Sequence, residues 1–172
     1  MQKTAIEWAD YSWPVINGCR RISTGCENCY AEKLSATRLR NHPKYVGLAV
    51  WKPGRGAQWT GETRLWPNDL AAPIKLKTPA RVFVCDMGDL FYEGVPNRQI
   101  AAVFGVMALA PRHTYMVLTK RPARMREWFQ WVAALGGDPA VECAKIAVRT
   151  EEELARSGQL PDPRRRLIRD AY

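Results

Sequence analysis

Two short apolar segments of β type lie in the middle of the chain, and each leads through a polar stretch into a helical pattern. The first spans residues 81–85 and the second spans 115–119. Apolar residues at helical spacing follow them, over 96–110 and about 123–135. Repetition of strand, loop and helix is typical of βα units on a parallel sheet. The sequence therefore predicts an α/β fold, either an open parallel sheet or a partial (βα) barrel.

The flanking parts of the chain are assigned by the same patterns. Residues 4–17 contain short apolar pieces that predict an extended segment, and a strong helix-forming run follows at 30–40. Residues 145–149 predict a last, weak strand, and a charged helix-like run comes after it. We therefore expect one βα domain over 1–150, followed by a charged helix and a mobile basic tail over 151–172.

The stretch from 43 to 80 is the least regular part of the sequence. It is rich in proline and glycine and carries Trp51, Trp59 and Trp66. We expect a long excursion with little regular structure, and such loops in compact domains are often functional. A packed surface loop, in which the tryptophans form a small core of their own, is an equally good interpretation.

Length and composition limit the class of protein. The chain has 172 residues, of which 47% are hydrophobic, and this is the size of a single domain. No apolar run approaches the roughly 18 residues of a membrane span, and the first residues lack the apolar core of an export signal. Five cysteines, three of them clustered, suit metal ligation in a reducing compartment better than a disulfide framework. We expect a cytoplasmic protein.

The three clustered cysteines are Cys19, Cys26 and Cys29, with the spacing C-x6-C-x2-C. Structural zinc sites are normally closed by four protein ligands. By contrast, an iron–sulfur cluster held by three thiolates has one iron open to an outside ligand. A zinc site could still be closed from elsewhere in the chain, by His42, His113, Cys85 or Cys143. The spacing therefore favours an iron–sulfur cluster, with zinc as the alternative.

Charged residues follow two predicted strands at the point where each strand ends. Asp86 and Asp89 follow the segment at 81–85, and Lys120 and Arg121 follow the next one. The carboxyl ends of parallel strands meet at one edge, so we expect these residues beside the cysteine loop. The acids could bind a cofactor's amino group or ribose hydroxyls, and the cations a phosphate or carboxylate. The alternatives are a capping role for Asp86 and a solvated helix start after Lys120.

Several blocks of sequence are shared with one family. They are Ile6-Glu7-Trp8, Gly18-Cys19, Gly25-Cys26, Cys29-Tyr30-Ala31-Glu32, RVFVCDMGDLF at 81–91, VFGVMALAPRH at 103–113 and VLTKRPARM at 117–125. Taken together, over roughly residues 4–130, these blocks resemble a phage-associated three-Cys-motif family of unknown function. That family is similar to radical S-adenosylmethionine enzymes, which are partial or full βα barrels.

The resemblance implies a cofactor and its ligands. In radical S-adenosylmethionine enzymes a loop after the first strand holds a 4Fe-4S cluster, and S-adenosylmethionine occupies the open iron. By resemblance, Cys19, Cys26 and Cys29 are the cluster ligands here. A closed eight-unit barrel needs about 200–250 residues, so the fold is expected to be truncated relative to a full barrel. Because an open sheet exposes an edge strand, a partner chain could complete it.

Three functions follow as hypotheses. The first is an iron–sulfur protein that cleaves S-adenosylmethionine and acts on an unknown substrate. The second is a zinc-stabilised nucleic-acid-binding module without catalysis. The third is an inactive, truncated family member. The formal charge of +9 favours nucleic acid or nucleotides as partners, although Arg164, Arg165, Arg166 and Arg169 contribute four of these charges.

Overall fold

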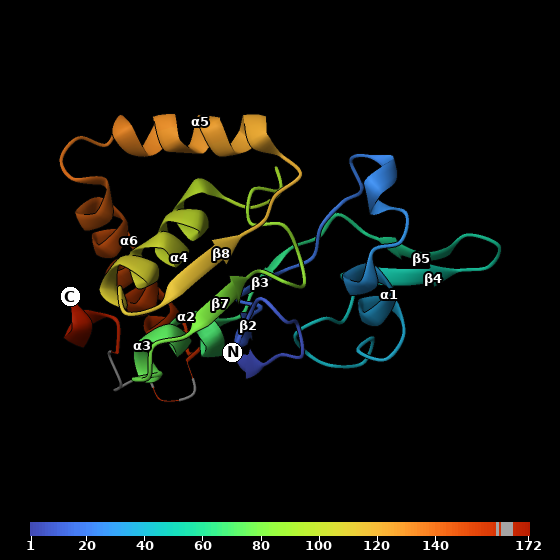
Figure 1. Ribbon diagram of the computed structural model, residues 1–172, viewed down its shortest axis with the longest axis horizontal. Coiled ribbons are helices and arrows are strands. Elements are labelled where there is room, and N and C mark those ends of the chain that lie inside the picture. Colours follow the sequence, from blue (N-terminus) through green and yellow to red (C-terminus); the bar gives the residue numbers. More distant parts are fainter. Residues whose placement is uncertain (161, 163–166) are drawn as a thin grey trace.

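The computed structural model describes residues 1–160, 162 and 167–172. Its centre is a four-stranded sheet with the strand order β1–β2–β7–β8 (Figure 1). The strands are β1 (Gln2–Lys3), β2 (Tyr11–Trp13), β7 (Arg81–Val84) and β8 (Thr114–Val117). β2, β7 and β8 are parallel, whereas β1 pairs antiparallel with β2. Within the described part of the chain this sheet stays open, so the fold is mixed α/β and no closed barrel forms.

Six α-helices and two further strand pairs surround this sheet in the described residues. The helices are α1 (Tyr30–Ala36), α2 (Pro67–Leu70), α3 (Ala72–Lys75), α4 (Asn97–Leu109), α5 (Pro122–Ala133) and α6 (Pro139–Arg156). The additional strands are β3 (Ile16–Asn17), which pairs with β6 (Arg64–Leu65), and β4 (Ala49–Lys52), which pairs with β5 (Gly56–Trp59). None of the described helices is long and apolar enough to cross a membrane.

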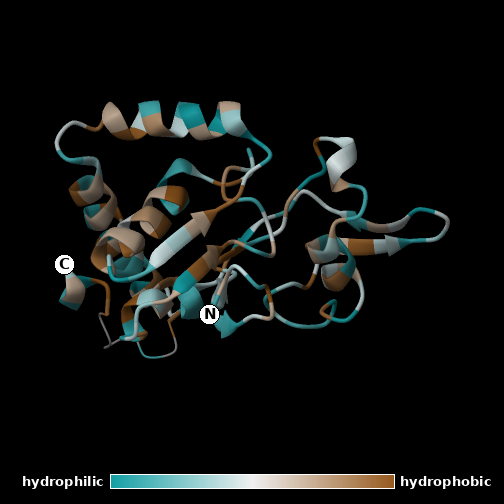
Figure 2. Ribbon diagram, in the orientation of Figure 1, coloured by the Kyte–Doolittle hydropathy of each residue, from teal (hydrophilic) through white to brown (hydrophobic). Residues whose placement is uncertain are grey.

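The main core lies between the sheet and the helices α4 and α6. Figure 2 shows apolar residues on β7, on α4 and at the carboxyl end of β8. α4 and α6 approach closely at Gly105, where a Cβ atom would lie 2.2 Å from the carbonyl oxygen of Cys143. Trp13 and Trp128 are both buried in this core. This packing fixes the sheet against which the site is built.

The predicted βα units are present. Strand β7 lies inside the predicted segment 81–85, and β8 begins one residue before the predicted segment 115–119. Helix α4 ends one residue before Ala110, and α5 begins at Pro122, where a proline costs no intrahelical hydrogen bond. Parallel pairing of β7 with β8 is therefore the arrangement that the strand–loop–helix order predicted.

The prediction of a strand at 145–149 is wrong, because these residues lie inside α6. Asp138 caps this helix, its Oδ1 accepting from the backbone N–H groups of Ala140 and Val141. Buried residues recur along it at helical spacing, on the side that faces α4: Cys143, Ala144, Ile146, Ala147, Leu154 and Ala155. The helix cap and the buried apolar face together stabilise a helix more than the β propensity of residues 145–149 favours a strand.

The stretch 43–80 is more regular than predicted. It contains the antiparallel hairpin β4–β5, strand β6 and the short helices α2 and α3. The hairpin packs on α1 through Ala36, Ala49 and Ala57, with Trp59 beside them. Small residues allow the helix and the hairpin to approach closely, and this contact is long-range, so the local sequence pattern does not reveal it.

Two predicted boundaries also move. Helix α1 ends at Ala36 rather than near residue 40, because Thr37 leaves the helical conformation. The charged helix that was expected after residue 150 is the last part of α6, which begins at Pro139. Residues 161 and 163–166 of the predicted mobile tail lie outside the described residues. Ile168, further along the tail, is buried, and its N–H donates to Glu151 Oε1 at 3.0 Å. The described end of the chain therefore packs on α6.

Candidate functional site

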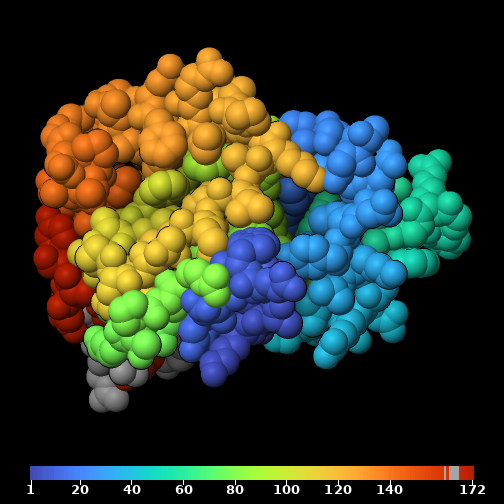
Figure 3. Space-filling view, viewed as in Figure 1, coloured from blue at the N-terminus to red at the C-terminus, as the bar shows by residue number. Residues whose placement is uncertain are grey.

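A pocket of about 690 Å³ lies at the carboxyl ends of the parallel strands. It is bordered by the cysteine loop after β3, the loop after β7 and the segment between β8 and α5. Figure 3 shows a hollow between the blue N-terminal segment and the yellow-orange segment near residue 120. All seven residues that the sequence singled out line this pocket: Cys19, Cys26, Cys29, Asp86, Asp89, Lys120 and Arg121. The expected meeting of three strand ends is confirmed.

Two glycines bring the cysteine loop to the strand ends. Gly18 has a φ of +92°, and a Cβ atom there would lie 2.1 Å from the carbonyl oxygen of Glu62. Its N–H donates to Met87 O at 3.1 Å. Gly88 bridges Gly18 in parallel register, and a Cβ on Gly88 would lie 2.8 Å from the Gly18 carbonyl oxygen. Only glycine fits this close approach, which places Cys19 directly beside the loop after β7.

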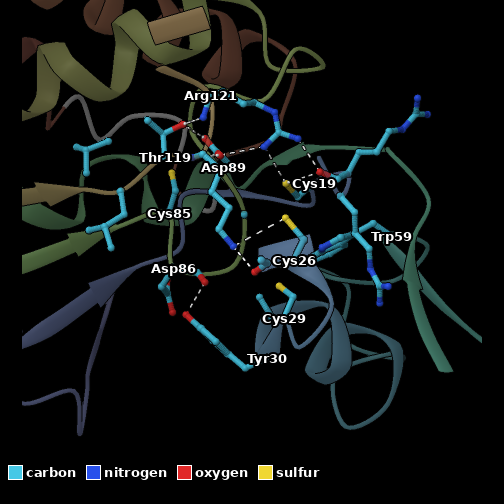
Figure 4. Close-up of a pocket in the computed structure, with 18 of the residues that line it drawn as sticks. Cys19, Cys26, Cys29, Tyr30, Trp59, Cys85, Asp86, Asp89, Thr119 and Arg121 are labelled. Carbon is cyan, nitrogen blue, oxygen red and sulfur yellow. Dashed lines mark hydrogen bonds and ion pairs between the residues drawn. The ribbon is translucent and has the colours of Figure 1, made fainter. Parts of the chain in front are cut away.

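The three loop cysteines are partly exposed and face the pocket (Figure 4). Two of them lie near cations from the segment after β8. Arg121 Nη1 is 3.6 Å from Cys19 Sγ, and Lys120 Nζ is 3.9 Å from Cys26 Sγ. Cys29 directly precedes helix α1. Nearby positive charge acts to stabilise thiolates at Cys19 and Cys26.

The pKa values of the Cys19 and Cys26 thiols are shifted in opposite directions. Burial raises the pKa of Cys19 to about 11, although the charge of Arg121 acts in the opposite direction. Burial also opposes ionisation of Cys26, but hydrogen bonds with the backbone of Ile22 and Ser23 and the charge of Lys120 outweigh it, so its pKa is lowered. Binding of a metal or cluster must therefore displace a proton from Cys19.

Asp89 is buried and already accepts four hydrogen bonds. Its Oδ1 accepts from the backbone N–H of Phe91 at 3.0 Å and from Thr119 Oγ1 at 2.8 Å. Its Oδ2 accepts from the backbone N–H of Lys120 at 3.1 Å and from Arg121 Nη1 at 2.9 Å. A carboxylate offers about four acceptor positions, so none is left for a ligand. The geometry favours a positioning role for Asp89 over the predicted contact with a cofactor.

Arg121 is likewise held by protein groups. Besides Asp89, its Nε donates to Glu93 Oε2 at 2.9 Å and its Nη2 donates to Arg20 O at 2.6 Å. The guanidinium also lies 4.9 Å from the ring centroid of Tyr92. Arg121 therefore connects the segment after β8 to the cysteine loop and to the loop after β7. Lys120, in contrast, is exposed and its ammonium donates to Gly25 O.

Asp86 is the carboxylate of the pocket that has one oxygen without a partner among the described residues. Burial raises its pKa to about 6, although a hydrogen bond with Ser12 and the charge of Lys44 act against this. Its Oδ1 is buried and has no hydrogen-bond partner in the described part of the chain. Tyr30 Oη donates to the backbone oxygen of Asp86, not to the carboxylate, at 2.6 Å. A buried acceptor without a partner is costly, and a pocket carboxylate with a raised pKa is a candidate functional group.

Glu32 is a residue of the site to which the sequence assigned no role. It is buried on α1 and accepts from Arg21 Nε at 2.9 Å and from the backbone N–H of Trp59 at 2.7 Å. Arg21 also donates to Ala57 O at 3.0 Å. Glu32 therefore connects the cysteine loop, α1 and β5. Its only signal in the sequence is its place three residues after Cys29, within the block shared with the resembled family.

The proposed fourth zinc ligands do not join the cysteines, with one exception. His113 is buried at the opposite end of the sheet, where its Nε2 lies 3.0 Å from Pro73 O. The Nδ1 of His42 accepts from the backbone N–H of Lys44 at 3.1 Å, and Cys143 lies on α6. Cys85 does line the pocket, and its φ of +57° is a strained backbone conformation at the end of β7.

The arrangement can be tested against each candidate group. In the part of the chain that the structure describes, no three His, Cys, Asp or Glu side chains converge to hold one metal ion. A closed zinc site requires such convergence on a single point. The thiolates of an iron–sulfur cluster bind different irons, so they surround the cluster rather than meet. Three cysteines around an open pocket therefore fit a cluster better than a single ion.

Comparison with protein-family models matches residues 3–159 to a family described as "Protein of unknown function (DUF5131)". No curated protein matches the chain. No solved structure matches it either.

Proposed function

Since the chain belongs to the DUF5131 family of proteins of unknown function, we propose a function from its site: the protein binds a 4Fe-4S cluster through Cys19, Cys26 and Cys29 and cleaves S-adenosylmethionine reductively. The observation that carries this proposal is that the three thiols border one pocket together with Asp86, one oxygen of which has no partner in the described residues. Three thiolates leave one iron open to an outside ligand.

The chemistry needs both the cluster and a one-electron donor outside the chain. The reduced cluster would supply one electron to break the C5′–S bond of S-adenosylmethionine, giving methionine and a radical that takes hydrogen from the substrate. The pocket volume of about 690 Å³ is in the usual range for cofactor sites. Phe83, Val117 and Met125 supply an apolar side to the pocket, and exclusion of water there would protect a reactive radical.

The chain's own residues would divide the binding of S-adenosylmethionine between them. Asp86 would accept a hydrogen bond from an ammonium group, which satisfies its buried oxygen and favours its ionised form. Lys120 is exposed at the pocket and would pair with a carboxylate. Asp89 and Arg121 would hold the loops in register rather than contact the ligand.

The test is anaerobic reconstitution with iron and sulfide, followed by visible absorption, iron and sulfide quantitation, and assay for 5′-deoxyadenosine under a strong reductant. We expect about four irons and four sulfides per chain, as in a 4Fe-4S cluster. Substituting any of Cys19, Cys26 or Cys29 by alanine should abolish this loading. Cys143→Ala is the matched control, because Cys143 lies on α6 outside the pocket.

Each other outcome has a meaning. One tightly held zinc ion without iron–sulfur absorption would refute the proposal and favour the zinc-stabilised module. A stable cluster without 5′-deoxyadenosine would refute the cleavage step and favour an inactive family member. Equal loading of Cys26→Ala and the parent protein would show that the three thiols have no joint role.

A further inference from the structure

Positive charge is concentrated in one part of the chain. Residues 20–60 contain eight basic and two acidic residues, so less than a quarter of the sequence supplies six of the nine excess charges. These residues form the cysteine loop, α1 and the hairpin β4–β5, which lie together on one side of the central sheet (Figure 1). We call residues 20–60 the basic lobe. Such a concentrated field attracts polyanions.

Most of the cations in the basic lobe have no acidic partner. Arg21 pairs with Glu32, and Lys44 pairs with Asp69. The remaining six are exposed and form no ion pair with any described carboxylate: Arg20, Lys33, Arg38, Arg40, Lys52 and Arg55. Unpaired exposed cations are available to phosphate groups without the cost of breaking an existing pair.

The hairpin β4–β5 adds exposed apolar surface to this charge. Trp51 is 57% exposed and Val50 is 40% exposed, although both lie within strand β4. Lys52 ends that strand, and Arg55 lies in the turn, where its N–H donates to Lys52 O at 3.0 Å. An exposed aromatic ring and exposed cations on the same hairpin are the combination that binds unpaired bases, since the ring stacks and the cations follow the backbone.

The basic lobe is continuous with the pocket. Arg20, Arg21 and Trp59 belong to the lobe and also line the pocket, as do the cysteines Cys26 and Cys29. Trp59 ends β5, the partner strand of the one that carries Trp51. A polynucleotide bound along the hairpin could therefore place one of its nucleotides toward the pocket.

We propose that the basic lobe binds single-stranded nucleic acid, with Trp51 stacking on a base and with Lys52 and Arg55 contacting phosphates. This inference deepens the proposed function. That the bound nucleic acid is also the substrate rests on that function. A duplex keeps its base faces stacked inside, so Trp51 could not stack on them, and single strands are the better fit. DNA and RNA share the chemistry that the lobe recognises.

The test is fluorescence anisotropy with labelled single-stranded 20-mers of DNA and of RNA, using the full chain before cluster loading and after it. Binding should weaken with salt. Lys52→Ala/Arg55→Ala should reduce the slope of log K against log salt by about 1.4, because each phosphate contact with a single strand contributes about 0.7. The matched control is Lys75→Ala/Lys77→Ala, which removes the same charge from exposed sites outside the lobe and should leave the slope unchanged.

Stacking is tested separately from charge. Trp51→Leu keeps apolar area but cannot stack, and should weaken binding by at least about fivefold, the lower end for one stacked base. Trp51→Phe should retain most of the affinity. Circular dichroism and thermal unfolding would verify that both variants fold. Comparing the affinities for the DNA and RNA 20-mers shows whether the lobe prefers deoxyribose or ribose.

Several results would overturn the inference. They are the absence of binding to either single strand at 50 mM salt, duplex DNA or polyglutamate binding as tightly as the single strands, and equal losses in the lobe and control variants. Cluster loading is measured separately from nucleic-acid binding, by visible absorption and iron content. Binding without a cluster would therefore refute the proposed function but not the lobe, and a cluster without binding would refute only the lobe.

Discussion

Asp89 Oδ2 lies 2.9 Å from Arg121 Nη1, and both side chains are buried beneath the pocket. The pair connects the loop after β7 to the first residue before α5, and Arg121 continues the connection to Arg20 in the cysteine loop. The three strand-end loops are thus held together by protein groups before any cofactor binds.

Asp89→Asn should destabilise the protein by about 3 kcal/mol, because it leaves the buried charge of Arg121 with only the exposed Glu93 as an ion-pair partner. Glu93→Gln is the matched control. Glu93 also pairs with Arg121, at 2.9 Å, but its side chain is exposed, so we expect a loss below about 1 kcal/mol. Urea unfolding of both variants measures the difference. Equal losses would mean that burial does not strengthen the Asp89 contact.

Asp86 should make stability depend on pH. Its pKa is raised to about 6, so between pH 4 and pH 6 the folded chain keeps a proton that the unfolded chain has lost. Folding stability must therefore fall as pH rises through this window, by about 2–3 kcal/mol at most. Asp86→Asn should remove this fall and be more stable than the parent at pH 7.5. Chemical denaturation at pH 4, 5, 6 and 7.5, without cofactor, tests this.

Asp10 is the matched control for this titration, because its pKa is shifted in the opposite direction from that of Asp86. Arg81 holds the pKa of Asp10 below its usual value, through side-chain and backbone hydrogen bonds. Asp10 therefore contributes stability at neutral pH that is lost as the solution is acidified. Asp10→Asn should reduce stability at pH 7.5 and leave the fall between pH 4 and pH 6 intact. If Asp86→Asn behaved in the same way, the pKa of Asp86 would not be raised in the folded protein.

Glu32→Gln should loosen the cysteine loop, because a neutral amide replaces the carboxylate that binds Arg21 and the Trp59 N–H. Alkylation of Cys26 and Cys29 by iodoacetamide should become severalfold faster, and the free energy of unfolding should fall by about 1–3 kcal/mol. Glu27→Gln, an exposed change in the same loop, is the control. Unchanged alkylation rates in Glu32→Gln would limit its role to packing of the hairpin.

Gly18→Ala should be the more damaging of two glycine substitutions at positive φ. At Gly18 the new Cβ would meet the Glu62 carbonyl oxygen at 2.1 Å, whereas at Gly54 it would meet no atom within 4 Å. Gly54→Ala should cost only the conformational strain, about 1–2 kcal/mol. Gly18→Ala should exceed that by several kcal/mol, or fail to fold. Comparable unfolding midpoints would show that the cysteine loop can shift away from Glu62.

The sequence predicted those parts of the fold that depend on local pattern. The strands at β7 and β8, the helices α4 and α5, and the gathering of Asp86, Lys120 and the cysteines at one edge all follow from apolar periodicity and strand polarity. Residues 145–149 were misassigned because five residues of β type cannot be distinguished from a segment of a buried helix by pattern alone. The decisive information was the contact of α6 with Gly105 on α4.

The three-cysteine loop and its position after the first strands were determined by the sequence itself, because spacing and residue type are local properties. The roles of the charged residues were decided only by the tertiary structure. Asp86 and Asp89 are three positions apart in one loop, yet Asp89 has four donors, three of them from the distant segment 119–121, and one oxygen of Asp86 has none. Hydrogen-bond saturation depends on which backbone and side chains fold around a carboxylate, and no local pattern contains that information.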